Sequence, residues 1–195
     1  MKTNIIILPA VAVVAIGIIA GCGNKGSKNS VTADKPAIET YFTAIDKYLT
    51  EEIGSGYRQG DVCIPFHSYT AVDESNGDDI HVWGDFWVFN YTVSGDTLKT
   101  VSGGDHPGKM HVRQTPDGHF EVTSFEAVAD GSDMEPSARR IFGDRFDEFQ
   151  KSNSDEKHRE DVRMAVISGY VRSHQIPVKI VQDYGWPAKP IPETE

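Results

Sequence analysis

The residues best placed to do chemistry lie at alternate positions of one segment, residues 80–93. In a strand, every second side chain points to the same side of the sheet. One side of this segment is an ordinary apolar face, whereas the other carries His81, Trp83, Asp85, Trp87, Phe89 and Tyr91. Apolar walls with a few polar groups are typical of a ligand pocket. The sequence therefore predicts a binding face whose contact residues are His81, Trp83, Asp85, Trp87 and Tyr91.

A second interpretation of the same face is packing. Helices on one side of the sheet and a second subunit or the C-terminal tail on the other would also bury a row of aromatic side chains. Large aromatic patches mark ligand sites and subunit interfaces alike. A homodimer formed through this face is the corresponding expectation.

Catalysis is the third interpretation, with His81 or Asp85 as a general base. Burial raises the pKa of an aspartate and lowers that of a histidine, so both would move toward neutrality in an apolar site. The sequence contains no Ser-His-Asp arrangement and no nucleophile elbow. Whether the protein is an enzyme stays open at this point, and binding is favoured over catalysis.

A glycine-rich run at residues 102–111 offers a metal site as an alternative to a turn. It contains Asp105, His106 and His111, and imidazole with carboxylate suits zinc. The histidines that could approach from elsewhere in the chain are His67, His81 and His119. Two histidines without helical or knuckle spacing favour a glycine-rich turn between strands. We therefore predict no metal site and no cofactor.

The start of the chain has the pattern of an export signal. Lys2 precedes an apolar run at residues 5–20, which ends in Ile19-Ala20-Gly21-Cys22. A charged start, an apolar core and a small-residue junction are typical of a signal peptide. The ending resembles the lipobox of bacterial lipoproteins. That resemblance implies a diacylglycerol on the Cys22 thiol, cleavage before Cys22 and acylation of the new amino terminus.

A transmembrane helix is the alternative for this run, but spanning a bilayer takes about 20 apolar residues. Residues 5–20 are fewer and contain Pro9. The lipoprotein pattern predicts an anchor in the cell envelope, outside the cytoplasm, and in the outer membrane if the cell is Gram-negative. The membrane is then one partner, reached through the N-terminal lipid. Because the formal net charge is −10, binding to nucleic acid is not expected.

The composition divides the chain into four parts. Residues 1–21 form the signal peptide, and residues 22–33, rich in Gly, Ser, Asn and Lys, form a flexible tether. Residues 34–182 are a single α+β domain, and residues 183–195 are a loose C-terminal tail. This size is suited to one hydrophobic core.

Within the domain, the hydrophobic period changes twice. Apolar residues recur every three or four positions over residues 38–53, which predicts an amphipathic helix. From residue 61 to 128 the period is two, with turn signals between short segments, as in an antiparallel meander. Two helices then follow, over residues 136–149 and 154–176, and residues 178–181 add an edge strand.

This order predicts an α+β fold with an N-terminal helix, a curved antiparallel sheet of four to six strands and two C-terminal helices. It resembles the cone-shaped folds related to nuclear transport factor 2 and to cystatin. Cone domains usually begin with more than one helix, whereas here two helices come last. The resemblance implies a curved sheet wrapped on a helix, but no function, because that architecture hosts isomerases, dehydratases and binding modules.

Together these patterns predict a lipid-anchored extracytoplasmic protein that binds a small molecule or a protein partner through the aromatic sheet face. The alternatives are a small cone-type enzyme with acid–base chemistry and a structural envelope protein that dimerises through the same face.

Overall fold

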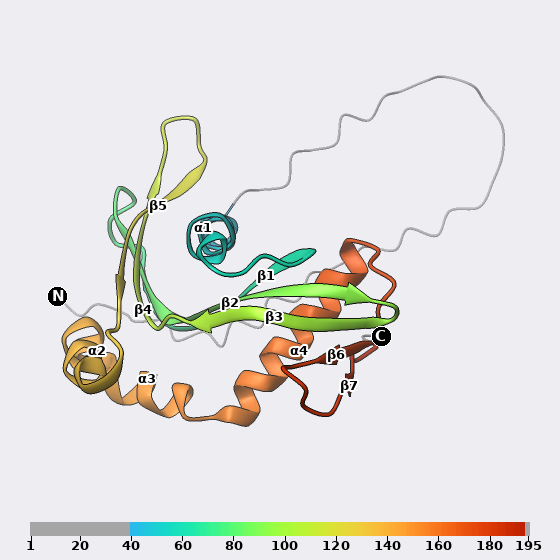
Figure 1. Cartoon of the computed structure of the whole chain (residues 1–195). Helices are drawn as coiled ribbons and strands as arrows, with labels where there is room; N and C mark the ends of the chain where they lie inside the picture. Colours follow the sequence, from blue (N-terminus) through green and yellow to red (C-terminus); the bar gives the residue numbers. More distant parts are fainter. Residues whose placement is uncertain (1–39, 194–195) are drawn as a thin grey trace, which may run out of the picture. The chain divides into compact units, whose positions relative to one another are not determined.

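The computed structural model describes residues 40–193, which form an α+β fold (Figure 1). The strands are β1 (Val62–Asp73), β2 (Ile80–Ser94), β3 (Thr97–Asp105), β4 (Gly108–Gln114), β5 (Phe120–Ala127), β6 (Ile180–Gln182) and β7 (Lys189–Pro190). The helices are α1 (Tyr41–Tyr48), α2 (Met134–Phe142), α3 (Phe146–Asn153) and α4 (Glu156–Ser173). Thus the predicted fold class is confirmed.

Strand β2 organises the seven-stranded sheet. It pairs with β1 along one edge, whereas its other edge pairs first with β4 and then with β3. Apart from β1, the strands lie side by side in the order β5-β4-β2-β3-β6-β7. Because β2 changes partner partway along, the two parts of the sheet diverge, and the sheet curves around α1 (Figure 1).

Helices cover both faces of β2. On one face, Ile45 and Leu49 of the N-terminal helical segment pack against Val82 and Phe86. On the other face lie α2, α3 and α4 (Figure 1). A strand buried on both sides needs apolar residues at nearly every position, which accounts for the composition of β2. Each fully buried large side chain contributes about 1.5–3 kcal/mol of transfer free energy.

The sheet differs from the prediction in its composition and direction. It has seven strands, and β6 runs parallel to β3, with Thr97 opposite Ile180. An antiparallel meander cannot supply this pair; the helical crossover through α2, α3 and α4 does. The first predicted C-terminal helix is also divided, because Gly143 has a φ of +54° and ends α2.

The chain after Gln182 is part of the fold, and the expected loose tail is therefore wrong for the described residues. Strand β7 pairs with β6, and Asp183 accepts hydrogen bonds from Arg163 of α4. The lipobox, Cys22 and the tether lie outside residues 40–193. None of the helices within residues 40–193 is long and apolar enough to cross a membrane.

Candidate functional site

The aromatic face of β2 is packed beneath the C-terminal helices. Trp83 is only 7% exposed, and its indole N–H donates a hydrogen bond of 2.9 Å to the carbonyl of Ile141 in α2. It packs with Phe142 of α2 and with Phe146 and Phe149 from the α3 segment. The prediction that Trp83 lines an open pocket is wrong, because α2 and α3 bury their own apolar sides against it.

Trp87 and Tyr91 lie farther along the same face, under α4. Both are buried, and they pack with Met164 of that helix. The guanidinium of Arg159 lies 4.9 Å above the Trp87 ring, and that of Arg163 donates a hydrogen bond of 3.1 Å to the Tyr91 hydroxyl. The packing interpretation therefore describes this face, and the chain's own helices provide the cover.

Asp85 is enclosed on the same face and is only 3% exposed. Its carboxylate accepts a hydrogen bond of 3.2 Å from Asn153 and lies 3.4 Å from the guanidinium of Arg159, which also pairs with Asp105. Burial and the neighbouring Asp105 carboxyl raise the pKa of Asp85 to about 9, although Arg159 and Asn153 act in the opposite direction. Asp85 therefore takes up a proton more readily than an exposed aspartate does.

The structure does not bring the two predicted catalytic residues together. Four residues along a strand span about 13 Å, and the Trp83 side chain lies between His81 and Asp85 on this face. His81 bonds to Asp79, whereas Asp85 bonds to Asn153. The shifted pKa of Asp85 is explained by its own burial within an ion-pair network, since structural networks perturb pKa values as active sites do.

The residues of the alternative zinc site are also dispersed. Asp105 pairs with Arg159, and His106 lies 3.0 Å from the hydroxyl of Tyr57. Burial lowers the pKa of His106, more than its neighbouring carboxylates raise it. His111 lies in the middle of β4, opposite His81. The alternative of a zinc site at Asp105, His106 and His111 is therefore wrong. His111 lies within β4, beyond the glycine-rich bend that contains Asp105 and His106.

His111 belongs instead to what we call the histidine cluster, which is composed of Asp79, His81, His111 and Glu126. The Asp79 carboxylate lies 2.9 Å from Nε2 of His81 and 2.8 Å from Nδ1 of His111. Nε2 of His111 lies 3.0 Å from the Glu126 carboxylate. The hydrogen bonds to His81 and His111 lower the pKa of Asp79.

The sequence pattern pointed to His81 and His111 as candidate ligands, but neither to Glu126 nor to Asp79 as a partner of these histidines. The two histidines meet because residues 80–84 of β2 pair with residues 108–112 of β4. Glu126 joins them because β5 pairs with the other edge of β4. Alternation alone places a residue on a face, whereas this cluster depends on the register between three strands.

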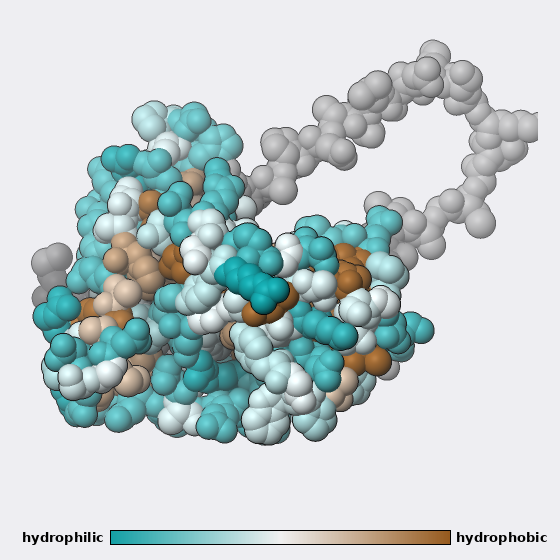
Figure 2. Space-filling model, viewed as in Figure 1, coloured by the Kyte–Doolittle hydropathy of each residue, from teal (hydrophilic) through white to brown (hydrophobic). Residues whose placement is uncertain are grey.

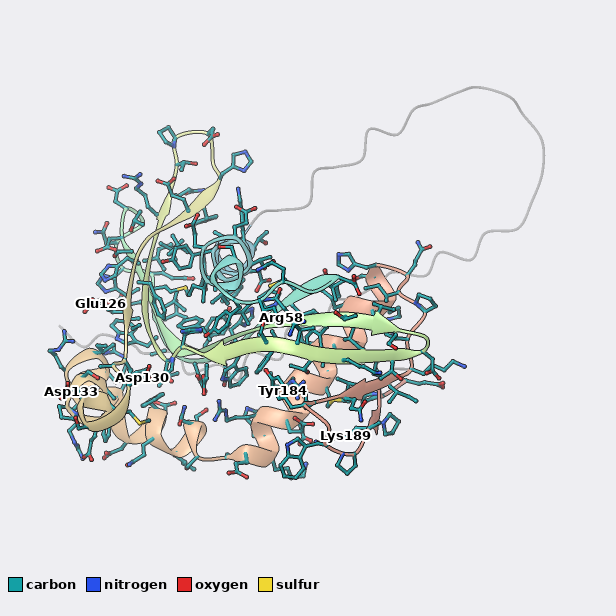
Figure 3. All side chains as sticks on the ribbon, in the orientation of Figure 1. Arg58, Glu126, Asp130, Asp133, Tyr184 and Lys189 are labelled. Carbon is teal, nitrogen blue, oxygen red and sulfur yellow. The ribbon has the colours of Figure 1, made fainter. Side chains whose placement is uncertain are left out.

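A groove of about 490 Å³ lies between β2, α4 and the C-terminal residues. We call it the C-terminal groove; its walls are Phe89, Arg163, Val181, Asp183, Tyr184, Trp186, Pro187, Ala188 and Lys189. Trp186 is 71% exposed and Tyr184 is 62% exposed. Tyr184 and Lys189 lie on the α4 side of the sheet (Figure 3).

A fixed ion pair forms part of the wall of this groove. Arg163 donates two hydrogen bonds, of 2.7 and 2.6 Å, to the two carboxylate oxygens of Asp183, and its guanidinium lies 5.1 Å above the Phe89 ring. Burial alone would raise the pKa of Asp183, but the hydrogen bonds from Arg163 and Thr100 lower it. Because this geometry is bidentate, the two charges have a defined orientation.

A tight turn presents the two exposed aromatic residues. Tyr184 and Gly185 both have positive φ angles, of +42° and +85°. The amide of Trp186 donates a hydrogen bond of 2.6 Å to the carbonyl of Asp183 and closes the turn. Positive φ is unfavourable for a tyrosine, and such strain is often retained at ligand sites. Sequence analysis missed these residues because it treated them as tail.

The aromatic face and the groove meet at one end of β2. Phe89 lines the groove directly, and the hydroxyl of Tyr91 accepts a hydrogen bond from Arg163, which also lines it. The surface in the view of Figure 2 is mostly hydrophilic, with separate small hydrophobic patches.

No known protein family, curated protein or solved structure matches this chain.

Proposed function

We propose that the protein is a lipid-anchored, extracytoplasmic binding module that holds a saccharide in the C-terminal groove. The observation that carries this proposal is the exposure of Trp186 and Tyr184 beside the fixed Arg163–Asp183 pair. Among the described residues, four large hydrophobic side chains are exposed, Val72, Met134, Tyr184 and Trp186, and two of them lie on this single turn.

The chemistry of these walls suits a sugar ring. A pyranose has a flat C–H face that stacks on an aromatic ring and an edge of hydroxyl groups that hydrogen-bond to charged side chains. Trp186 and Tyr184 supply rings, whereas Arg163, Asp183 and Lys189 supply polar partners. The groove thus has the apolar walls and the few fixed polar groups that characterise small-molecule sites.

The lining also favours binding over catalysis. Its only carboxylate, Asp183, accepts hydrogen bonds from Arg163, and these lower its pKa. A general acid or base needs a pKa near the working pH. The alternatives, a cone-type enzyme and a dimerising envelope protein, stay predictions, and both were based on the aromatic face that α2, α3 and α4 cover.

The lipid anchor follows from the lipobox at residues 19–22 and supports an extracytoplasmic site of action. A tether of residues 22–33 would keep the module near the membrane, within reach of cell-wall glycans. The resemblance to cone folds is compatible with this proposal, since that architecture includes binding modules.

Replacing Trp186 with alanine should weaken saccharide binding at least tenfold. Stacked aromatic side chains are typical binding hot spots, and loss of about 1.4 kcal/mol corresponds to a factor of ten in Kd. The measurement is isothermal titration of the full-length chain with the trisaccharide of N-acetylglucosamine, and with trisaccharides of glucose and xylose.

The matched control is Met134→Ala, which truncates an exposed hydrophobic residue outside the groove and should leave the Kd unchanged. Absence of binding by all three trisaccharides would contradict the proposal. So would a trisaccharide that binds the wild-type protein and the Trp186→Ala variant with equal affinity.

A further inference from the structure

Three potential metal ligands converge in the histidine cluster, away from the C-terminal groove. Asp79, His81 and His111 each offer one ligand atom, and these atoms all lie within 4.8 Å of one another. The Asp79 carboxylate lies between the two imidazoles, with one oxygen facing each ring. Zinc bonds to histidine nitrogen and to carboxylate oxygen at about 2.0–2.2 Å, so small side-chain adjustments would bring all three atoms to one ion.

Glu126 orients His111 for this role. Its carboxylate lies 3.0 Å from Nε2 of His111 and 2.5 Å from the ammonium of Lys109. An ion bound by His111 would take the place of the proton between Nδ1 and Asp79, while Nε2 donates its proton to Glu126. Metal-binding histidines usually donate their second N–H to a carboxylate in this way. Glu126 reaches the site from β5 (Figure 3).

The backbone holds the histidines in place. His81 of β2 and His111 of β4 are directly opposite each other in the antiparallel pair, and their ring centroids are 4.6 Å apart. The ring of Trp83 lies edge-on to His81 at 5.4 Å and forms a wall of the site. Trp83 is itself fixed by the hydrogen bond to Ile141. Sites built on strands keep their geometry better than sites built on loops.

We propose that Asp79, His81 and His111 bind one zinc ion, with Glu126 as the positioning residue for His111. Two imidazoles and one carboxylate suit zinc better than calcium or magnesium, which prefer oxygen ligands. Three protein ligands leave one position of a tetrahedral ion for water or for a donor from a ligand. All four side chains are partly exposed, so an ion can enter from solvent.

The test is titration of the full-length chain with zinc chloride after removal of metal by a chelator and dialysis. One ion should bind per chain, and zinc at about 100 times its Kd should raise the melting temperature by about 5–10 °C. His81→Gln and His111→Gln should weaken the affinity at least 100-fold. Glu126→Gln should weaken it by about 10–100-fold, which is typical of an orienting carboxylate.

The matched control is His158→Gln, which removes an exposed imidazole on α4 and should bind zinc like the wild-type protein. Asp79→Asn provides a variant at a partly exposed position just before β2, in case a histidine variant fails to fold, and it should also lose affinity. Failure of the wild-type chain to bind zinc would overturn the proposal, as would equal affinities of the Asp79→Asn and His158→Gln variants. Saccharide titration of His81→Gln separates the two proposals, because the groove does not include the histidine cluster.

Discussion

Replacing Trp83 with alanine should lower the free energy of unfolding by about 3–5 kcal/mol, the range for a large aromatic residue removed from a core. The indole is 7% exposed, packs between α2 and α3, and donates a hydrogen bond to the Ile141 carbonyl. Truncation would leave a cavity and an unpaired carbonyl. Urea unfolding at pH 7 measures this difference as a shift of the midpoint at constant m value.

Trp186→Ala is the matched control, since it makes the same chemical change at a side chain that is 71% exposed. It should change the free energy of unfolding by less than about 0.5 kcal/mol. The two variants should thus have opposite profiles: Trp83→Ala should lower stability, whereas Trp186→Ala should weaken the proposed saccharide binding. A loss below about 1 kcal/mol for Trp83→Ala would mean that the helices do not cover β2 as described.

Replacing Asp85 with asparagine should make the protein more stable at pH 8, by about 2–4 kcal/mol. Burial and Asp105 raise the pKa of Asp85 to about 9, far above the ordinary value of 3.8 that an aspartate has in an unfolded chain. Between these two values the folded state holds a proton that the unfolded state has released. Stability therefore falls as the pH rises, by up to about 1.36 kcal/mol per pH unit. The measurement is urea unfolding of both proteins from pH 4 to pH 9.

The Asp85→Asn variant should show a flatter pH dependence, and the two curves should converge near pH 4. Asp183→Asn is a control of opposite sign, because hydrogen bonds from Arg163 and Thr100 lower the pKa of Asp183. Its contribution to stability is present above the unfolded pKa and is lost as the pH falls, so Asp183→Asn should destabilise the protein at neutral pH. A wild-type stability that rises between pH 5 and 8, with Asp85→Asn less stable, would contradict the assignment for Asp85.

The sequence predicted the strands well because their hydrophobic pattern is local. Alternation identified both faces of β2, and turn signals identified the breaks between β2, β3, β4 and β5. It could not show what covers the mixed face, since that depends on where the chain returns after residue 128. Arg159 and Arg163 are of a residue type that is mostly exposed, yet their guanidinium groups lie over Trp87 and Phe89. Long stems allow arginine to cover an aromatic ring while it reaches a carboxylate.

The sites were less predictable than the fold because their residues are brought together by pairing between distant segments. Lys109 and His111 lie within the run that suggested a metal site, but the other residues of the histidine cluster come from β5, from the start of β2 and from the bend just before it. The C-terminal groove depends on residues near Pro187 and Pro190, whose prolines are typical of an irregular tail. A tail that pairs with β6 and binds Arg163 is a tertiary effect, and local propensity contains no information about it.

The parallel pair of β3 and β6 has a consequence for the order in which the protein assembles. Strands β1 to β5 pair with neighbours that are near in sequence, and such contacts form quickly. Ile180 can pair with Thr97 only after the three intervening helices have been made. The turn at Tyr184 comes later still in the chain. During synthesis, the sheet around β2 can therefore form early, whereas the C-terminal groove forms last. In a nascent chain, the part of the core between α1 and the sheet can thus form before the helices cover the other face of β2 and before the C-terminal groove exists.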